Sequence, residues 1–161
     1  MCVIALSDRV RPTPDMIEKM FSSNSEGAGI AWQDTDKKKE KIVRWQKGLN
    51  LDEIQALAAE VPLPFVCHFR ISTCGPKGSQ ELCHPFPIES SVPLILNGRS
   101  KGFVLFHNGH WADWRKTCID MATKHKLELP KGKWSDSRAM AWLASQAGIG
   151  VLEMLDQMIV A

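Results

Sequence analysis

Residues 27–46 read GAGIAWQDTDKKKEKIVRWQ and predict a β-hairpin. The glycines and alanines of residues 27–32 mark a strand whose backbone another segment approaches closely. Residues 42–46 supply the partner strand, and the charged stretch between the two strands forms the tip of the hairpin. The lysines in that stretch have acidic neighbours, so we assign it to a solvated loop.

The segments around this hairpin alternate between strands and helices. On its C-terminal side, a capping box predicts a helix over residues 50–60, and an apolar strand over residues 65–69 ends at Arg70. On its N-terminal side, residues 2–6 read as a short buried strand. A helix with a threonine cap and a proline in its first turn is expected over residues 13–21.

The second half of the chain is predicted to hold a loop, a hairpin and then helices. Residues 72–91 read as a long loop, and residues 92–106 read as a hairpin that turns at Asn97-Gly98. Helices are expected over residues 111–125, 136–147 and 150–160. This order predicts an α+β fold, in which two mainly antiparallel sheets are flanked by helices within a single domain of residues 1–161.

The composition excludes several classes of protein. The chain is 44% hydrophobic and 24% charged, and its net charge of +2 is too small for a typical nucleic-acid-binding domain. No stretch approaches the roughly 18 apolar residues of a membrane span, and charged residues follow the apolar residues 1–6 too soon for a signal peptide. The 5 cysteines lack the spacing of a disulfide framework. We therefore expect a cytoplasmic protein with reduced thiols and with neither a nucleic-acid nor a membrane partner.

Cys2 is the first candidate for chemistry. Methionine before a small residue is a good substrate for initiator-methionine removal, which would leave a thiol and a free α-amine on one residue. An α-amine has an ordinary pKa of about 7.7–8.0 and can accept a proton from the thiol near neutral pH. Taken alone, Cys2 can equally be a small apolar residue that opens a strand.

Three further positions carry candidate binding groups. Arg70, at a strand end before a glycine-containing turn, could hold a carboxylate or form a surface ion pair. Asn108-Gly109 follows an apolar strand and could form a turn or supply the N–H groups of an oxyanion hole. Asp136 could cap a helix, act as an acid in its first turn, or bind an ammonium group.

Together these segments resemble the class II glutamine amidotransferases, which are N-terminal-nucleophile (Ntn) amidohydrolases. The resemblance extends over residues 1–140, and the segments occur in the order of the family. The matching segments are Met1-Cys2-Val3-Ile4, residues 26–31 (EGAGIA), residues 68–75 (HFRISTCG), His84-Pro85-Phe86, Phe106-His107-Asn108-Gly109 and Ser135-Asp136-Ser137.

The resemblance implies a four-layer α/β/β/α sandwich and hydrolysis of the side-chain amide of L-glutamine. Cys2 would be the nucleophile, with its own α-amine as base, and Asn108 and the N–H of Gly109 would form the oxyanion hole. Arg70 would hold the α-carboxylate of the substrate and Asp136 its α-ammonium group. Thr73 and Gly75 would line the pocket, and residues 84–86 would shape it without a chemical step. The implied mechanism requires no metal and no cofactor.

The chain also departs from the family, in which a longer glutaminase domain is usually fused to a synthase that consumes the ammonia. Here we expect a separate acceptor chain or a free-standing amidohydrolase. Hydrolysis of another γ-glutamyl amide or peptide, and a non-catalytic module that retains the fold, remain alternatives. A metal site is a weaker alternative, because its candidate ligands lack the spacing of matched zinc-ligand pairs. Those candidates are Cys67, His68, Cys74, Cys83, His84, His107 and His110.

Overall fold

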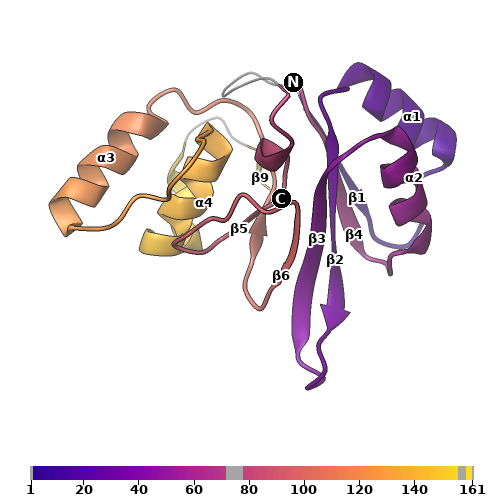
Figure 1. Cartoon of the computed structure of the whole chain (residues 1–161), viewed down its shortest axis with the longest axis horizontal. Coiled ribbons are helices and arrows are strands. Elements are labelled where there is room, and N and C mark those ends of the chain that lie inside the picture. The colour runs from indigo at the N-terminus through magenta and orange to yellow at the C-terminus, as the bar shows by residue number, and fades with distance from the viewer. Residues whose placement is uncertain (1, 72–77, 156–158, 161) are drawn as a thin grey trace.

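A five-stranded antiparallel sheet forms the centre of the molecule (Figure 1). The computed structural model describes residues 2–71, 78–155 and 159–160 of the chain, the last two by their backbone alone. The order of strands across the sheet is β1 (Val3–Ser7), β4 (Phe65–Phe69), β2 (Ala28–Thr35), β3 (Lys41–Leu49) and β6 (Asn97–Ser100). Two short antiparallel pairs accompany it, β5 (Phe86–Pro87) with β7 (Val104–Leu105) and β8 (His107–Asn108) with β9 (Ile159–Val160).

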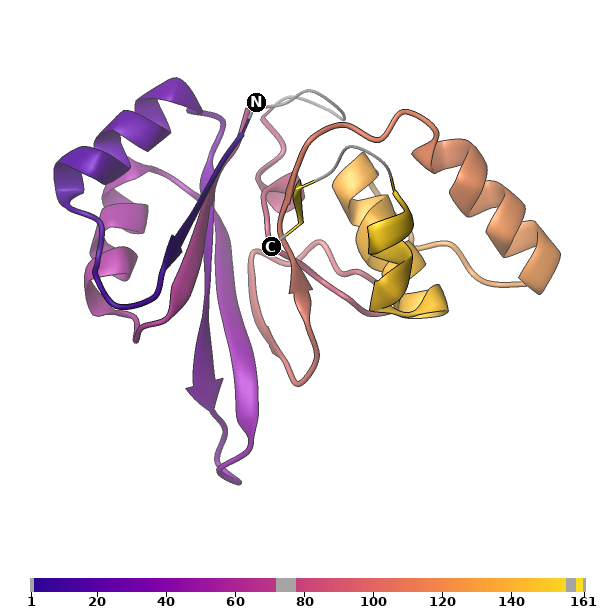
Figure 2. The ribbon, with the colours of Figure 1, turned by 180° about the vertical axis from the view of Figure 1, so that it is seen from behind.

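Helices lie on both sides of these strands (Figures 1 and 2). One face of the large sheet is covered by α1 (Pro14–Ser23) and α2 (Leu51–Glu60). On the other side, the short strands lie between the large sheet and two helices, α3 (Trp114–His125) and α4 (Asp136–Ala147). Short 3-10 helices occupy Gln80–Leu82 and Ile149–Met154. Within the described residues, no helix is long and apolar enough to cross a membrane. The α+β fold with antiparallel sheets and flanking helices is as the sequence predicts.

Local signals of the first half of the chain are confirmed. The hydroxyl of Thr13 accepts a hydrogen bond from the backbone of Met16 and caps α1. Asn50 and Glu53 form the predicted capping box of α2, with N–O distances of 3.0 and 2.8 Å.

The strand at the N-terminus also forms, but the prediction that it is buried is wrong. It pairs only with β4 at the edge of the sheet, and Leu6 is 70% exposed.

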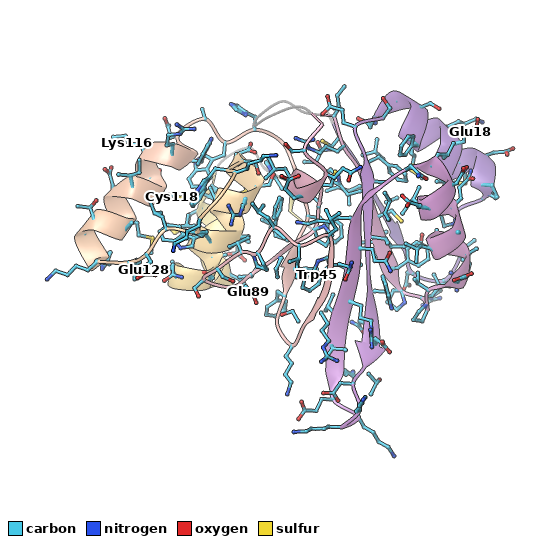
Figure 3. All side chains as sticks on the ribbon, viewed as in Figure 1. Glu18, Trp45, Glu89, Lys116, Cys118 and Glu128 are labelled. Carbon is cyan, nitrogen blue, oxygen red and sulfur yellow. The ribbon has the colours of Figure 1, made fainter. Side chains whose placement is uncertain are left out.

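The predicted hairpin over residues 92–106 is wrong. Asn97-Gly98 does not turn the chain but lies in β6, which pairs with β3 and places Gly98 opposite Trp45. A β-carbon at Gly98 would lie 2.3 Å from the indole of Trp45. The glycine therefore allows the backbone of β6 to pack closely on this aromatic ring. Trp45 lies between the two halves of the molecule (Figure 3). The next strand, β7, pairs with β5 instead.

The predicted helix over residues 150–160 is wrong at its end. A 3-10 helix over Ile149–Met154 packs on α4, and Ile159–Val160 forms a strand whose backbone pairs with β8. β-Branched residues favour strands, and here a partner strand is available. The helix predicted over residues 136–147 is confirmed, and that over 111–125 begins at Trp114. The described part of the long loop predicted over residues 72–91 holds the first 3-10 helix and β5.

The two faces of the large sheet differ in chemistry. The face toward α1 and α2 carries an apolar core that includes Ile30, Ile54 and Phe65. A second apolar core, around Trp142, lies among α3, α4, β5 and β7. Between the two cores, the inner face of the sheet is apolar at Trp45. Further along the same strands, the inner face of the sheet becomes polar. A buried layer of ionisable side chains therefore lies between the two apolar cores.

Gly29 sets the distance between the large sheet and the chain that crosses its inner face. Gly29 pairs with Lys47 on β3 and with His68 on β4, so these three residues form one row across the sheet. A β-carbon at position 29 would lie 1.8 Å from the carbonyl oxygen of His84. The backbone of His84 therefore lies directly on the strand, which is the close approach that the small residues of this segment predict.

We expect Gly29→Ala to destabilise the protein, because the added methyl group overlaps a backbone atom that cannot rotate away. Overpacking of this kind typically costs about 1–3 kcal/mol or more. The free energy of unfolding, measured by urea denaturation, should fall by at least about 2 kcal/mol. Gly150→Ala is the matched control, since among the described residues no atom outside its own stretch of backbone lies within 4 Å of the added methyl group. Equal stability of the two variants would contradict the close approach.

Candidate active site

One pocket brings together Cys2, Arg70, Gly109 and Asp136, which the sequence proposes from distant segments. Its described walls enclose about 30 Å³, which is the room of about one water molecule. An amino-acid-sized ligand therefore requires that these walls move or that it enters from the open side. The residues that line the pocket are Cys2, Arg70, Ile71, Leu82, His84, His107, Gly109, Ser135, Asp136 and Ser137.

Cys2 lies at the start of β1, at the seam between the large sheet and the short strands. Its Sγ atom is 3.4 Å from the carbonyl oxygen of Ile71 and 3.5 Å from the backbone nitrogen of the same residue. The carboxamide of Asn108, on β8, donates a hydrogen bond of 2.8 Å from Nδ2 to the carbonyl oxygen of Cys2. This bond joins the two layers and fixes the backbone of Cys2 beside the pocket.

Asn108 and Gly109, the predicted oxyanion-hole residues, lie at the end of β8. A carboxamide carries two N–H groups, and Asn108 uses one of them to bind the carbonyl of Cys2. Its Oδ1 atom is buried and has no hydrogen-bond partner among the described residues. Gly109, the residue after Asn108, has a φ of 155° and lines the pocket. Asn108 is thus bonded to the backbone of Cys2, and Gly109 lines the same pocket as the Cys2 side chain.

Arg70 follows β4 and is held by its backbone and its side chain. Its backbone N–H donates to the carbonyl of Gly27 at 3.0 Å, and its carbonyl accepts from the N–H of Glu26 at 3.1 Å. The guanidinium is buried, with Nη1 3.4 Å from Oε2 of Glu26. The alternative of a surface ion pair is therefore correct in the ion pair, which Arg70 forms with Glu26, but wrong in the exposure, because the guanidinium is buried and lines the pocket.

Asp136 is the first residue of α4, and Ser135, not Asp136, caps that helix. The carboxylate is buried, with its Oδ1 atom 2.9 Å from the backbone N–H of Ser137. Its Oδ2 atom accepts a hydrogen bond of 3.2 Å from the backbone N–H of Trp111. A carboxylate is stable at this position because the helix N-terminus carries a partial positive charge. Asp136 thus lines the same pocket as Arg70, with its carboxylate oriented by two backbone N–H groups.

The predicted pocket residues Thr73 and Gly75 lie outside the described residues, as do Cys74 and Met1. Glu26, His107, His110 and Ser137 contact the site although the sequence assigns them no role in it. Glu26, His107 and Ser137 occur inside the family-like segments, but nothing in their residue types marks a contact with Arg70 or Asp136.

Three buried histidines form the polar layer beneath the pocket. The ring centroid of His84 is 4.0 Å from that of His68 and 6.5 Å from that of His107. Nδ1 of His107 contacts the hydroxyl of Ser137 at 2.9 Å. The other ring nitrogens of these histidines are buried and have no protein partner within the described part of the chain. Buried polar atoms of this kind usually bind ordered water.

Burial keeps these imidazoles neutral. It lowers the pKa of His68 to about 3, and the pKa of His84 lies well below its ordinary value because of burial and of the charges around it. Burial also lowers the pKa of His107, against the attraction of Asp136. Lys47 lies in the same layer, 4.4 Å above the ring of Phe86, and burial lowers its pKa to about 8.

The described residues contain no group of three or more His, Cys, Asp or Glu side chains placed to hold a metal ion. Comparison with models of known protein families and with curated proteins gives no match to the chain. The geometry of the pocket is therefore the basis for an assignment of function.

The neutral histidines predict a loss of stability in acid. An unfolded histidine has a pKa of about 6.5, so below that pH the unfolded chain binds protons that the folded His68 does not bind. The stabilising contribution is complete above about pH 6.5 and is lost as the pH falls toward the folded pKa, at up to about 1.4 kcal/mol per pH unit for each histidine.

Urea denaturation between pH 7.5 and 5 measures this slope. In His68→Met the slope should be smaller than in the wild type, whereas His125→Gln, at an exposed position, should leave it unchanged. An unchanged slope in His68→Met would show that this imidazole titrates alike in the folded and unfolded states.

Proposed function

We propose that the chain is a glutamine amidohydrolase of the class II amidotransferase type. It hydrolyses the C–N bond of the glutamine side-chain amide and gives glutamate and ammonia. One observation carries this proposal: Cys2, Arg70, Gly109 and Asp136 line one pocket, and Asn108 binds the carbonyl of Cys2 at 2.8 Å.

The charges of the pocket match those of a free amino acid. L-Glutamine carries an α-carboxylate and an α-ammonium group, and Arg70 and Asp136 offer one buried cation and one buried anion. A guanidinium binds a carboxylate through two parallel hydrogen bonds, which fixes its orientation. A substrate held at both groups extends its side-chain amide toward a third point of the pocket, where Cys2 lies.

The reaction proceeds in two steps once Met1 has been removed. The α-amine of Cys2 takes the thiol proton, and the thiolate attacks the carbon of the side-chain amide. The C–N bond breaks, the amine returns the proton to the leaving nitrogen, and ammonia departs from a thioester on Cys2. Water, deprotonated by the same amine, then hydrolyses the thioester to glutamate and restores the thiol.

The negative oxygen of each tetrahedral intermediate requires donors that are already in place. The second N–H of the Asn108 carboxamide and the backbone N–H of Gly109 take this role in the proposal. The bond from Asn108 to the carbonyl of Cys2 supports it, because it holds the donor and the nucleophile in a fixed relation before substrate binds.

The layer order also supports the assignment. Helices, the large sheet, short strands and helices follow one another across the molecule, which is the order of the α/β/β/α sandwich of Ntn hydrolases (Figure 1). We propose that architecture for the chain. The ammonia would serve an acceptor enzyme on a separate chain, and the reaction uses no metal or other cofactor.

Ammonia release from L-glutamine tests the proposal. The wild type, with Met1 removed, should release ammonia, and Cys2→Ala should abolish the release while retaining the fold. Cys118→Ala is the matched control, because that thiol is buried between α3 and α4, away from the pocket (Figure 3). Turnover of γ-glutamyl-anilide without turnover of glutamine would favour another γ-glutamyl amide as substrate. Inactivity toward both would favour a non-catalytic module.

Asn108→Ala should lower kcat by about 10²–10³, since loss of one oxyanion donor has this effect in other hydrolases. KM should change much less, because the donor acts on charge that develops only in the transition state. Asn97→Ala on β6 changes the same residue type at an exposed position and should have no effect. Steady-state kinetics, with thermal denaturation to exclude misfolding, make the comparison. Loss of affinity with kcat intact would instead assign Asn108 to ground-state binding.

A further inference from the structure

The Oδ2 atom of Asp136 is the point at which the pocket can bind a cation. The Oδ1 atom of Asp136 accepts from the backbone N–H of Ser137 at 2.9 Å and lies 3.5 Å from the hydroxyl of the same residue. Oδ2 accepts from the backbone N–H of Trp111 at 3.2 Å. A carboxylate oxygen can accept more than one hydrogen bond, so Oδ2 retains capacity for a positively charged donor.

His110 already lies beside this oxygen. It follows β8 on the same short segment as Gly109, and its Nδ1 atom is 3.6 Å from Oδ2 of Asp136. That separation exceeds an ordinary N–H···O hydrogen bond. The side chain of His110 is 55% exposed, whereas that of Asp136 is 6% exposed. The imidazole can therefore exchange protons with solvent while its partner stays buried.

We propose that protonated His110 competes with the α-ammonium group of the substrate for Oδ2 of Asp136. The inference rests on the proposed function and adds a determinant of affinity to the same site. An imidazolium that moves a few tenths of an ångström toward Oδ2 forms an ion pair and occupies the position that the ammonium group needs. A neutral imidazole leaves Asp136 as an unneutralised anion, and the pocket then binds the amino acid more tightly.

The charges near His110 favour this competition. Asp136 on α4 attracts the protonated ring, and His107 on β8 interacts electrostatically with it. Burial lowers the pKa of His107, so a positive charge on that buried ring is disfavoured.

The test compares KM for L-glutamine at pH 8 and pH 5.5 in the wild type, His110→Gln and His125→Gln. Partly exposed ion pairs are weak, so we expect KM of the wild type to rise about two- to fivefold more than that of His110→Gln as the pH falls. His125→Gln, at an exposed position on α3, should behave as the wild type. The pH dependence of kcat, which reports the α-amine of Cys2, should be the same in all three.

Calorimetry separates binding from chemistry. The dissociation constant of L-glutamine, measured with the Cys2→Ala chain, should show the same extra rise in acid, and His110→Gln in that background should remove it. An identical pH dependence of KM in wild type and His110→Gln would overturn the inference and leave the proposed function intact. An affinity of His110→Gln for L-glutamine that is weaker than that of the wild type at low pH would also overturn the inference. A wild type that neither hydrolyses nor binds glutamine would overturn the proposed function and the inference together.

Discussion

The carbonyl oxygen of His84 lies where the β-carbon of any residue other than glycine at position 29 would be. This contact brings a chain segment from the second half of the protein directly onto the inner face of the large sheet. The pocket depends on that approach, because its walls come from both halves. Cys2 and Arg70 belong to the sheet, whereas Gly109 and Asp136 belong to the short strands and α4. If the two halves of the protein lay further apart, the residues of the pocket would be divided between two separate surfaces.

The close approach also buries ionisable groups that need compensation. The layer between the two apolar cores holds three imidazoles, of which only the His107 ring bonds another side chain within the described residues, and an amine above a phenyl ring. The cost of burying a charge is avoided because the histidines remain neutral. The buried neutral histidines lower the stability of the protein in acid.

The sequence predicts the parts of this structure that depend on local chemistry. The capped helices, the strands of the first half and the close approach at Gly29 all follow from residue types within a few positions of one another. The errors occur where a distant partner overrides a local signal. Asn97-Gly98 is a turn dipeptide, but Trp45 and the open edge of β3 draw it into a strand. The end of the chain becomes a strand because β8 is there to pair with it.

The same distinction between local signals and distant partners applies to the candidate site. The order of its segments along the chain is enough to predict Cys2, Arg70, Asn108 and Asp136 as candidates. The contact of Glu26 with Arg70, the layer of histidines and the position of His110 depend on pairs of residues far apart in sequence. No single segment carries those pairs, and only the folded arrangement of both halves reveals them.

The central claim is that Cys2, freed of Met1, is the nucleophile of a glutamine-shaped pocket. An intact-mass spectrum after incubation with a diazo-ketone analogue of glutamine tests it most directly. The account predicts a chain that lacks the mass of methionine and carries one covalent adduct, with no adduct on Cys2→Ala. A chain that retains Met1, or a processed chain that takes no adduct, would contradict it.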